Sequence, residues 1–108
     1  MSASISPAEL QTRLASANPP RLLDVREPEE HAFAALPGST LIPLAELAAR
    51  TDELAPWQDE EIVVYCHHGV RSLHGISVLR HFGFMRLVNL SGGIDAWSRE
   101  VDATVPRY

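Results

Sequence analysis

The chain has 108 residues, a net charge of −5 and a hydrophobic content of 45%, which suits one domain with its own core. All nine basic residues are arginines and they form no basic run, so neither nucleic acid nor an anionic membrane is an expected partner. The single cysteine cannot form an internal disulfide, and the sequence shows neither a secretory signal nor an apolar run of membrane-spanning length. We expect one cytoplasmic domain over residues 1–108, either a monomer or a homodimer.

Helix and strand signals alternate in the first half of the chain. A helix is predicted from Ser6, which precedes a proline and lies three residues before a glutamate. It should end before Asn18, where two prolines follow. Residues 21–25 predict a short buried strand, Pro28 begins a short helix with acidic residues in its first turn, and residues 40–42 predict a brief strand.

The second half continues this alternation. Its predicted elements, in order, are a helix over 44–54, a polar and solvated connection over 57–61, a strand over 62–65, a helix over about 72–82, a strand over 87–90, a helix over 94–100 and a polar tail over 101–108. The strand over 62–65 is apolar throughout, as strands buried on both faces of a parallel sheet are. Strands and helices that alternate in this way predict an α/β fold with a mainly parallel sheet.

Two charged residues, Asp24 and Arg26, come at the end of the strand over 21–25, where open α/β sheets hold their ligands. Charged groups also perturb one another in purely structural ion pairs, which are the more common case. We therefore expect a structural ion pair or a turn cap at these two positions.

The only cysteine, Cys66, lies where the buried strand over 62–65 ends and a helix is about to begin. A tight loop that leads into a helix turns backbone N–H groups toward one point, and the helix dipole adds partial positive charge there. Gly69 permits loop angles that other residues resist, and Arg71 brings a fixed positive charge. A cysteine by itself is more often a small buried hydrophobe, but these features together predict a thiolate nucleophile in an anion-binding loop.

Three histidines, His67, His68 and His74, lie near the cysteine in sequence. One thiolate with clustered histidines falls short of a zinc-binding framework, and a metal would block the nucleophile. We therefore expect neither a metal nor a cofactor. His67 and His68 are instead expected to face the mouth of the loop, where a histidine can carry charge near neutral pH.

The loop sequence from Cys66 to Ser72 resembles the active-site loop of the rhodanese family, in particular that of its small single-domain sulfurtransferases. Residues 23–30 resemble the family's early Asp-Val-Arg motif, and residues 91–97 resemble its late Gly-Gly-x-x-Ala-Trp motif. All three stand in the family's order and approximate spacing. Residues 34–39 and Leu41 depart from the family pattern, and both lie outside the cysteine loop.

The resemblance implies a three-layer sandwich around a mainly parallel sheet of about five short strands, with helices on both faces. It also implies a sulfurtransferase that moves a sulfane sulfur from a donor such as thiosulfate to cyanide, a small thiol or a protein thiol. In the implied reaction Cys66 is the catalytic residue and carries the sulfur as a persulfide. The implied substrate-binding residues follow it directly: His67, His68, Gly69, Val70, Arg71 and Ser72.

Two other functions stay open on the sequence alone. Cysteine-dependent phosphatases, including rhodanese-like ones, also place cysteine and arginine in a strand-to-helix loop. They separate the two by one residue more than the four that intervene between Cys66 and Arg71, and the shorter loop favours a single sulfur over a phosphoryl group. The other alternative is a non-catalytic interaction module on the same fold, although modules of that kind commonly lack the cysteine.

Overall fold

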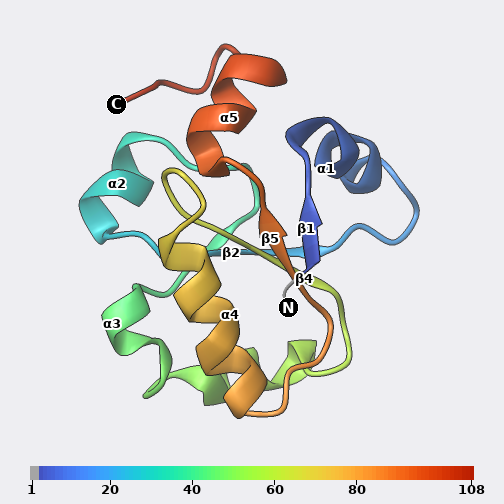
Figure 1. Cartoon of the computed structure of the whole chain (residues 1–108), viewed down its shortest axis with the longest axis vertical. Helices are drawn as coiled ribbons and strands as arrows, with labels where there is room; N and C mark the ends of the chain where they lie inside the picture. The colour runs from blue at the N-terminus through green and yellow to red at the C-terminus, as the bar shows by residue number, and fades with distance from the viewer. Residues whose placement is uncertain (1–2) are drawn as a thin grey trace.

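Strands and helices alternate along the computed structural model, which describes residues 3–108 (Figure 1). In chain order the elements are β1 (Ala3–Ile5), α1 (Pro7–Leu14), β2 (Arg21–Asp24), α2 (Pro28–Phe33), β3 (Thr40–Leu41), α3 (Leu44–Leu47), the 3-10 helix η1 (Thr51–Trp57), β4 (Ile62–Tyr65), α4 (Arg71–His81), β5 (Leu87–Leu90) and α5 (Gly93–Glu100). Within residues 3–108 the strands form one five-stranded sheet in the order β1-β5-β4-β2-β3, and each pairing is parallel. The predicted α/β fold with a mainly parallel sheet is confirmed.

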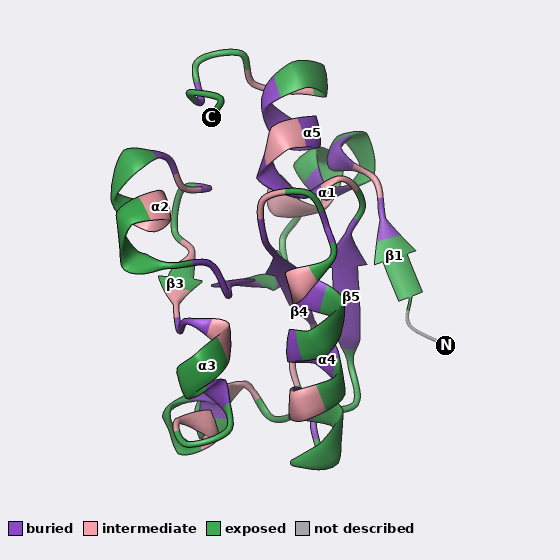
Figure 2. Cartoon of the chain, turned by 60° about the vertical axis from the view of Figure 1, so that its left-hand side comes forward, coloured by how far each residue is buried: buried purple, intermediate pink, exposed green. Residues whose placement is uncertain are grey.

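Apolar side chains cover both faces of this sheet. Along β4, Val63 and Tyr65 belong to one hydrophobic cluster, whereas Ile62 and Val64 belong to the other, because successive residues of a strand point to opposite faces. The first cluster includes side chains of α1 and α5, and the second includes side chains of α3 and α4. Figure 2 shows β4 and β5 buried between these layers. The expected three-layer sandwich is confirmed, and across residues 3–108 none of its helices has the length and apolar character that a membrane span requires.

Local signals place most element boundaries correctly. At the start of α1, the Ser6 hydroxyl accepts from the Glu9 N–H at 3.1 Å and the Glu9 carboxylate accepts from the Ser6 N–H at 3.1 Å, so the predicted capping box is confirmed. The sequence does not predict β1, because only Ile5 of its three residues is buried and so short a segment shows no periodicity. β1 forms through its pairing with β5.

The single helix predicted over 44–54 is wrong in its second half. α3 ends at Leu47 after four residues, and the chain continues as a 3-10 helix from Thr51. Thr51 and Asp52 carry side chains that compete with the helical backbone for hydrogen bonds, and Pro56 supplies no N–H donor. The tighter 3-10 turn therefore replaces an α-helix here.

The acidic connection over 57–61 is exposed or half-buried, as predicted, and two of its carboxylates also form ion pairs. Glu60 accepts from Arg21 at 3.0 Å, and Glu61 pairs with Arg13. The two arginines come 48 and 39 residues earlier in the chain than their partners, so no local pattern reveals these pairs. They fix the approach to β4 against α1 and β2.

Candidate active site

The loop between β4 and α4 places Cys66 at the carboxyl end of a central strand, just before a helix begins (Figure 1). Cys66 is only 1% exposed because it continues directly from the buried strand. Gly69 has a φ of +99°, a conformation that residues with a side chain rarely adopt. The loop therefore turns back over the cysteine within the four residues that precede Arg71.

The first carbonyl groups of this loop face α5. The N–H groups of Ile94 and Asp95 donate to the carbonyl oxygens of Cys66 and His67, at 2.9 and 3.1 Å. Gly93 comes so close to the loop that a Cβ atom there would lie 2.5 Å from the Cys66 carbonyl oxygen. The amino terminus of α5 thus takes up the carbonyls of Cys66 and His67, and the Gly69 N–H faces the sulfur.

Two polar groups lie beside Cys66 Sγ. The Gly69 N–H donates to Sγ at 3.0 Å, and Ser72 Oγ lies 3.5 Å from Sγ. Ser72 belongs to the first turn of α4, and the amino end of a helix carries partial positive charge. A backbone N–H donor and a helix amino terminus both stabilise a negatively charged sulfur. The loop is thus able to hold an anionic thiolate or persulfide at a buried position.

Asn89 of β5 holds the cysteine loop through hydrogen bonds. The sequence analysis does not predict this role of Asn89. Ser72 donates its hydroxyl hydrogen to Asn89 Oδ1, and Asn89 Nδ2 donates to the Gly69 carbonyl at 3.4 Å. The Asn89 side chain is buried. The sequence feature that points to Asn89 is a polar residue inside an otherwise apolar strand. A buried amide needs hydrogen-bond partners, so such a residue is expected to hold a neighbouring segment.

Arg71, the first residue of α4, is held in an ion pair. Its Nη1 and Nη2 atoms donate to the two carboxylate oxygens of Glu30, on α2, at 2.7 and 2.9 Å. This bidentate contact is the main reason why the pKa of Glu30 falls to about 2. The sequence predicts a fixed positive charge at Arg71 among the substrate-binding residues, and the structure sets the Glu30 carboxylate against that charge. The effect of Arg71 on an anionic donor stays a prediction.

Asp24 and Arg26 form a fully buried ion pair at the end of β2. Arg26 Nε and Nη2 donate to the Asp24 carboxylate at 2.8 and 2.7 Å, and both side chains are fully buried. Arg26 Nη2 also donates to the Ala34 carbonyl at 2.6 Å. The expected structural ion pair is confirmed, and it ties the end of β2 to the segment that follows α2.

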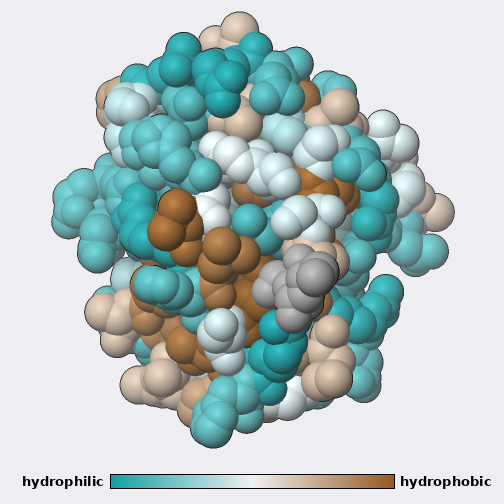
Figure 3. All heavy atoms as spheres, viewed as in Figure 1, coloured by the Kyte–Doolittle hydropathy of each residue, from teal (hydrophilic) through white to brown (hydrophobic). Residues whose placement is uncertain are grey.

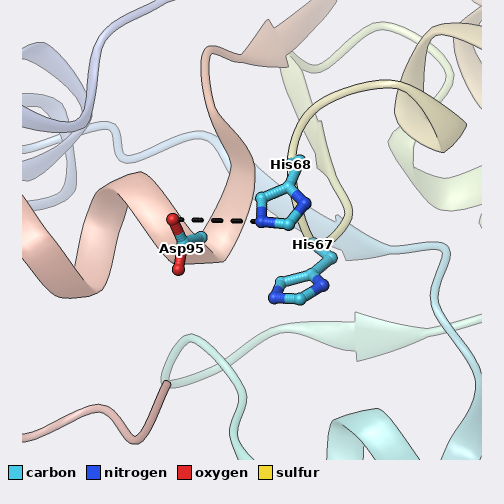
Figure 4. A group of neighbouring side chains, drawn as sticks. All are labelled: His67, His68 and Asp95. Atoms are coloured by element: carbon cyan, nitrogen blue, oxygen red, sulfur yellow. Dashed lines mark ion pairs between the residues drawn. The ribbon is translucent and has the colours of Figure 1, made fainter. Parts of the chain in front are cut away.

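His67 and His68 stack on each other beside the loop, and His68 faces Asp95 (Figure 4). Together with Asp95 they are the group within residues 3–108 whose side chains lie close enough to hold a metal. An imidazole binds a metal through a lone pair in the ring plane, but these two rings are 3.9 Å apart and within 21° of parallel. Asp95 already accepts from Arg99 and Arg107, each at 3.0 Å. The arrangement does not suit a metal.

The two histidines differ in burial. Among the described residues, His67 Nε2 has no hydrogen-bond partner and is shielded from solvent. Burial first, and then the charge of His68, lower the pKa of His67 below its usual value of 6.5. The surroundings of His67 thus favour its neutral form, whereas His68 is exposed.

Two exposed apolar side chains follow the cysteine closely in the sequence. Val70 in the loop is 66% exposed and Leu73 in the first turn of α4 is 41% exposed. Figure 3 shows apolar side chains, drawn in brown, gathered over the face of the molecule that carries α4. Exposed apolar side chains therefore accompany the polar groups of the cysteine loop.

Comparison with known proteins agrees with this geometry. The model of the rhodanese-like domain family matches residues 6–100. A sulfurtransferase from Allochromatium vinosum is 35% identical over 95 residues, which cover 88% of this chain and 87% of that protein. An adenylyltransferase and sulfurtransferase, uba4, from Ogataea parapolymorpha is 33% identical over 96 residues, and this match covers 89% of this chain but only 24% of that protein.

Two solved structures share the whole fold. A rhodanese-related protein from Thermoplasma volcanium has a TM-score of 0.80 and 33% identity, with 92% of this chain and 93% of that chain covered. The human single-domain sulfurtransferase TSTD1 has a TM-score of 0.76 and 29% identity, with 93% and 98% covered. Fold, cysteine loop and sequence similarity lead to one conclusion: the chain belongs to the rhodanese-like family.

Proposed function

We propose that this protein is a rhodanese-type sulfurtransferase in which Cys66 carries a sulfane sulfur as a persulfide. The observation that carries this proposal is the 3.0 Å hydrogen bond from the Gly69 N–H to the buried Cys66 Sγ, next to the amino end of α4. A preorganised donor of this kind stabilises negative charge on sulfur without first having to reorganise. Membership of the rhodanese-like family supports the same chemistry.

In the first step, the Cys66 thiolate attacks the outer sulfur of a donor such as thiosulfate. A bond forms between Sγ and that sulfur, while the sulfur–sulfur bond of the donor breaks and sulfite leaves with its electron pair. The negative charge of the thiolate moves to the terminal sulfur of the new persulfide. The loop N–H groups and the amino end of α4 stabilise this charge.

In the second step, an acceptor attacks the terminal sulfur and Cys66 leaves as a thiolate. Cyanide is released as thiocyanate, and a small thiol or a protein thiolate becomes a persulfide in its turn. The residues after Cys66 form the proposed substrate-binding loop: His67, His68, Gly69, Val70, Arg71 and Ser72. Both steps are displacements at sulfur that need no cofactor, and residues 1–108 supply the proposed site as one domain.

Intact-mass measurement tests the proposed intermediate directly. Reduced protein is incubated with thiosulfate, freed of small molecules and weighed, and we expect a gain of one sulfur atom. Addition of cyanide should reverse the gain and release thiocyanate. The matched control is Cys66→Ser, which should gain no mass because its alcohol is too weak a nucleophile. Absence of any gain, with thiosulfate and with glutathione persulfide alike, would contradict the proposal.

The same preparations separate the two other functions. Hydrolysis of an aryl phosphate that is lost in Cys66→Ser would identify a phosphatase instead. If well-folded protein forms no persulfide and hydrolyses no aryl phosphate, a non-catalytic binding module is the function that remains. We expect negligible phosphatase activity, because the loop between Cys66 and Arg71 holds only four residues.

A further inference from the structure

Tyr108 lies against the cysteine loop, although it is far from that loop in sequence. Its ring stacks on the His67 imidazole, with centroids 3.9 Å apart and planes within 9° of parallel. Phe33, at the end of α2, makes a T-shaped contact with the same ring at 5.7 Å between centroids. Figure 1 shows the tail after α5 running back toward α2. The segment that the sequence predicts as a polar tail therefore packs on the residue next to the proposed nucleophile.

The Tyr108 hydroxyl joins two charged groups. It accepts from Arg26 Nη1 at 2.7 Å and donates to Glu30 Oε2 at 2.7 Å. Burial is the largest cause that raises the pKa of Tyr108 to about 12, so the hydroxyl keeps its hydrogen and remains a donor at neutral pH. Glu30 in turn holds Arg71 through two hydrogen bonds.

One side chain thus reaches both ends of the loop. The ring covers His67, the first residue after Cys66, and the hydroxyl reaches Arg71 through Glu30, where the loop passes into α4. Gly69, whose N–H donates to the sulfur, lies between these two points. A loop that is fixed at both ends loses little further freedom when a substrate is bound and positioned.

We propose that Tyr108 is a positioning residue that clamps both ends of the Cys66 loop and so holds the Gly69 N–H on the sulfur. The effect of the clamp on sulfur transfer rests on the proposed function, whereas its effect on the loop does not. Tyr108 acts through His67 and Glu30 and makes no contact with the reacting sulfur in this scheme. Its loss should therefore slow the formation of the persulfide more than it weakens the binding of the donor.

If Tyr108 only covered His67 with its ring, the two hydrogen bonds of its hydroxyl would have no part in its role. Arg26 is fully buried and already bonds Asp24, yet it directs Nη1 to the phenol oxygen. Phenylalanine at position 108 would cover the same surface without these bonds. The variants Tyr108→Phe and Tyr108→Ala therefore separate the hydroxyl from the ring. Phe82→Ala is the matched control, because Phe82 is also about half exposed, at 46%, but lies at the far end of α4.

Three measurements apply to each variant: hydrogen exchange of the Gly69 amide, the NMR titration of His67, and the rate of persulfide formation with thiosulfate. In Tyr108→Ala, the Gly69 amide should exchange about tenfold faster, the effect of losing a hydrogen bond to a charged group. The pKa of His67 should rise toward 6.5, because the ring that buries it is gone. His68, Asp95, Glu30 and the backbone of residue 108 also act on His67, and all four are present in every variant. Persulfide formation should slow by about tenfold, mainly in kcat.

Tyr108→Phe should leave the His67 titration in place, because the stacked ring remains, and should still speed exchange of the Gly69 amide. Phe82→Ala should resemble wild type in all three measurements. Wild-type exchange and titration in Tyr108→Ala would overturn the clamp. Should wild type form no persulfide while the loop measurements respond as expected, the proposed function fails and the clamp stands. Should persulfide form equally fast in all variants despite a looser loop, the positioning role is overturned.

Discussion

Ser72 turns its hydroxyl hydrogen toward Asn89 and its oxygen toward Cys66. A hydroxyl has one hydrogen, so Ser72 cannot donate to Asn89 and to the sulfur at the same time. A protonated Cys66 can donate to the Ser72 oxygen, whereas an anionic sulfur would compete with Asn89 for the Ser72 hydrogen. Asn89 therefore sets how far Ser72 contributes to the stabilisation of a charged sulfur.

This relationship predicts that Asn89 and Ser72 act as a unit. Asn89→Ala should lower the free energy of unfolding by about 1–3 kcal/mol, because it leaves buried partners unsatisfied. Ser72→Ala removes the same hydrogen bond, so the double variant should lose less than the sum of the two single losses. Urea unfolding of the four proteins gives the coupling. Strictly additive losses would contradict a shared hydrogen bond.

Cys66→Ser should keep the fold and lose sulfur transfer. The serine oxygen can accept the Gly69 N–H in place of the sulfur, so the change in unfolding free energy should stay below about 1 kcal/mol. Thermal unfolding checks the fold, and thiocyanate release from thiosulfate and cyanide checks the activity. Activity close to that of wild type would remove Cys66 from the mechanism.

The ion pair of Arg71 with Glu30 predicts opposite effects of two substitutions on the KM for thiosulfate. Glu30→Gln removes the compensating carboxylate, so Arg71 should attract the dianion more strongly and KM should fall. Arg71→Ala leaves Glu30 without its cation, so KM should rise, and both changes should shrink as salt screens the exposed charges. Steady-state kinetics at two salt concentrations test this. A shift in the same direction for both variants would be inconsistent with it.

Glu30 also predicts how stability depends on pH. Its pKa lies near 2 in the folded protein, below the usual 4.5, so the unfolded chain takes up the proton first as the pH falls. The ion pair with Arg71 thus stabilises the fold fully above pH 4.5, and this contribution is lost as the pH falls toward 2. Urea unfolding across this range should show a steeper loss for wild type than for Glu30→Gln. Parallel curves would exclude Glu30 as the cause.

Gly93 and Gly38 form a matched pair for testing the contact between α5 and the loop. Both have positive φ values, +63° and +79°, but a Cβ at Gly93 would collide with the loop backbone and a Cβ at Gly38 would meet nothing within 4 Å. Gly38→Ala should therefore cost only the conformational strain, about 1–2 kcal/mol. Gly93→Ala should cost more and should also slow persulfide formation, because it displaces the Cys66 carbonyl. Equal losses of unfolding free energy in the two variants would show that the close approach of Gly93 to the cysteine loop is unimportant.

The sequence predicts the position of the cysteine loop, with its proposed nucleophile, because the features that define the loop are local. The apolar run of β4, Gly69 and the helix after Arg71 lie within about twenty residues of one another, and each leaves a pattern in composition or spacing. The same holds for the capping box at Ser6 and for the order of strands and helices. Local patterns therefore suffice for the fold class and for the position of the cysteine loop between its strand and its helix.

The supports of the loop escape such reasoning because they come from distant segments. Glu30 reaches Arg71 across 41 residues, Asn89 reaches Ser72 across 17, and Tyr108 reaches Glu30 across 78. No periodicity in the sequence links such pairs, so the sequence does not show that Glu30 pairs with Arg71. The sequence therefore predicts the local pair of Asp24 and Arg26 but not the distant pair of Arg71 and Glu30.

The contact between α5 and the loop carbonyls also constrains the order in which the protein assembles. Ile94 and Asp95 hold the backbone of Cys66 and His67, and these two partners leave the ribosome well after the cysteine does. Within residues 3–108, β1 likewise pairs with β5 alone, so the first strand of the sheet cannot pair until the last one has been synthesised. During synthesis the cysteine loop therefore cannot gain the support of α5 until residues 94 and 95 have been added to the chain.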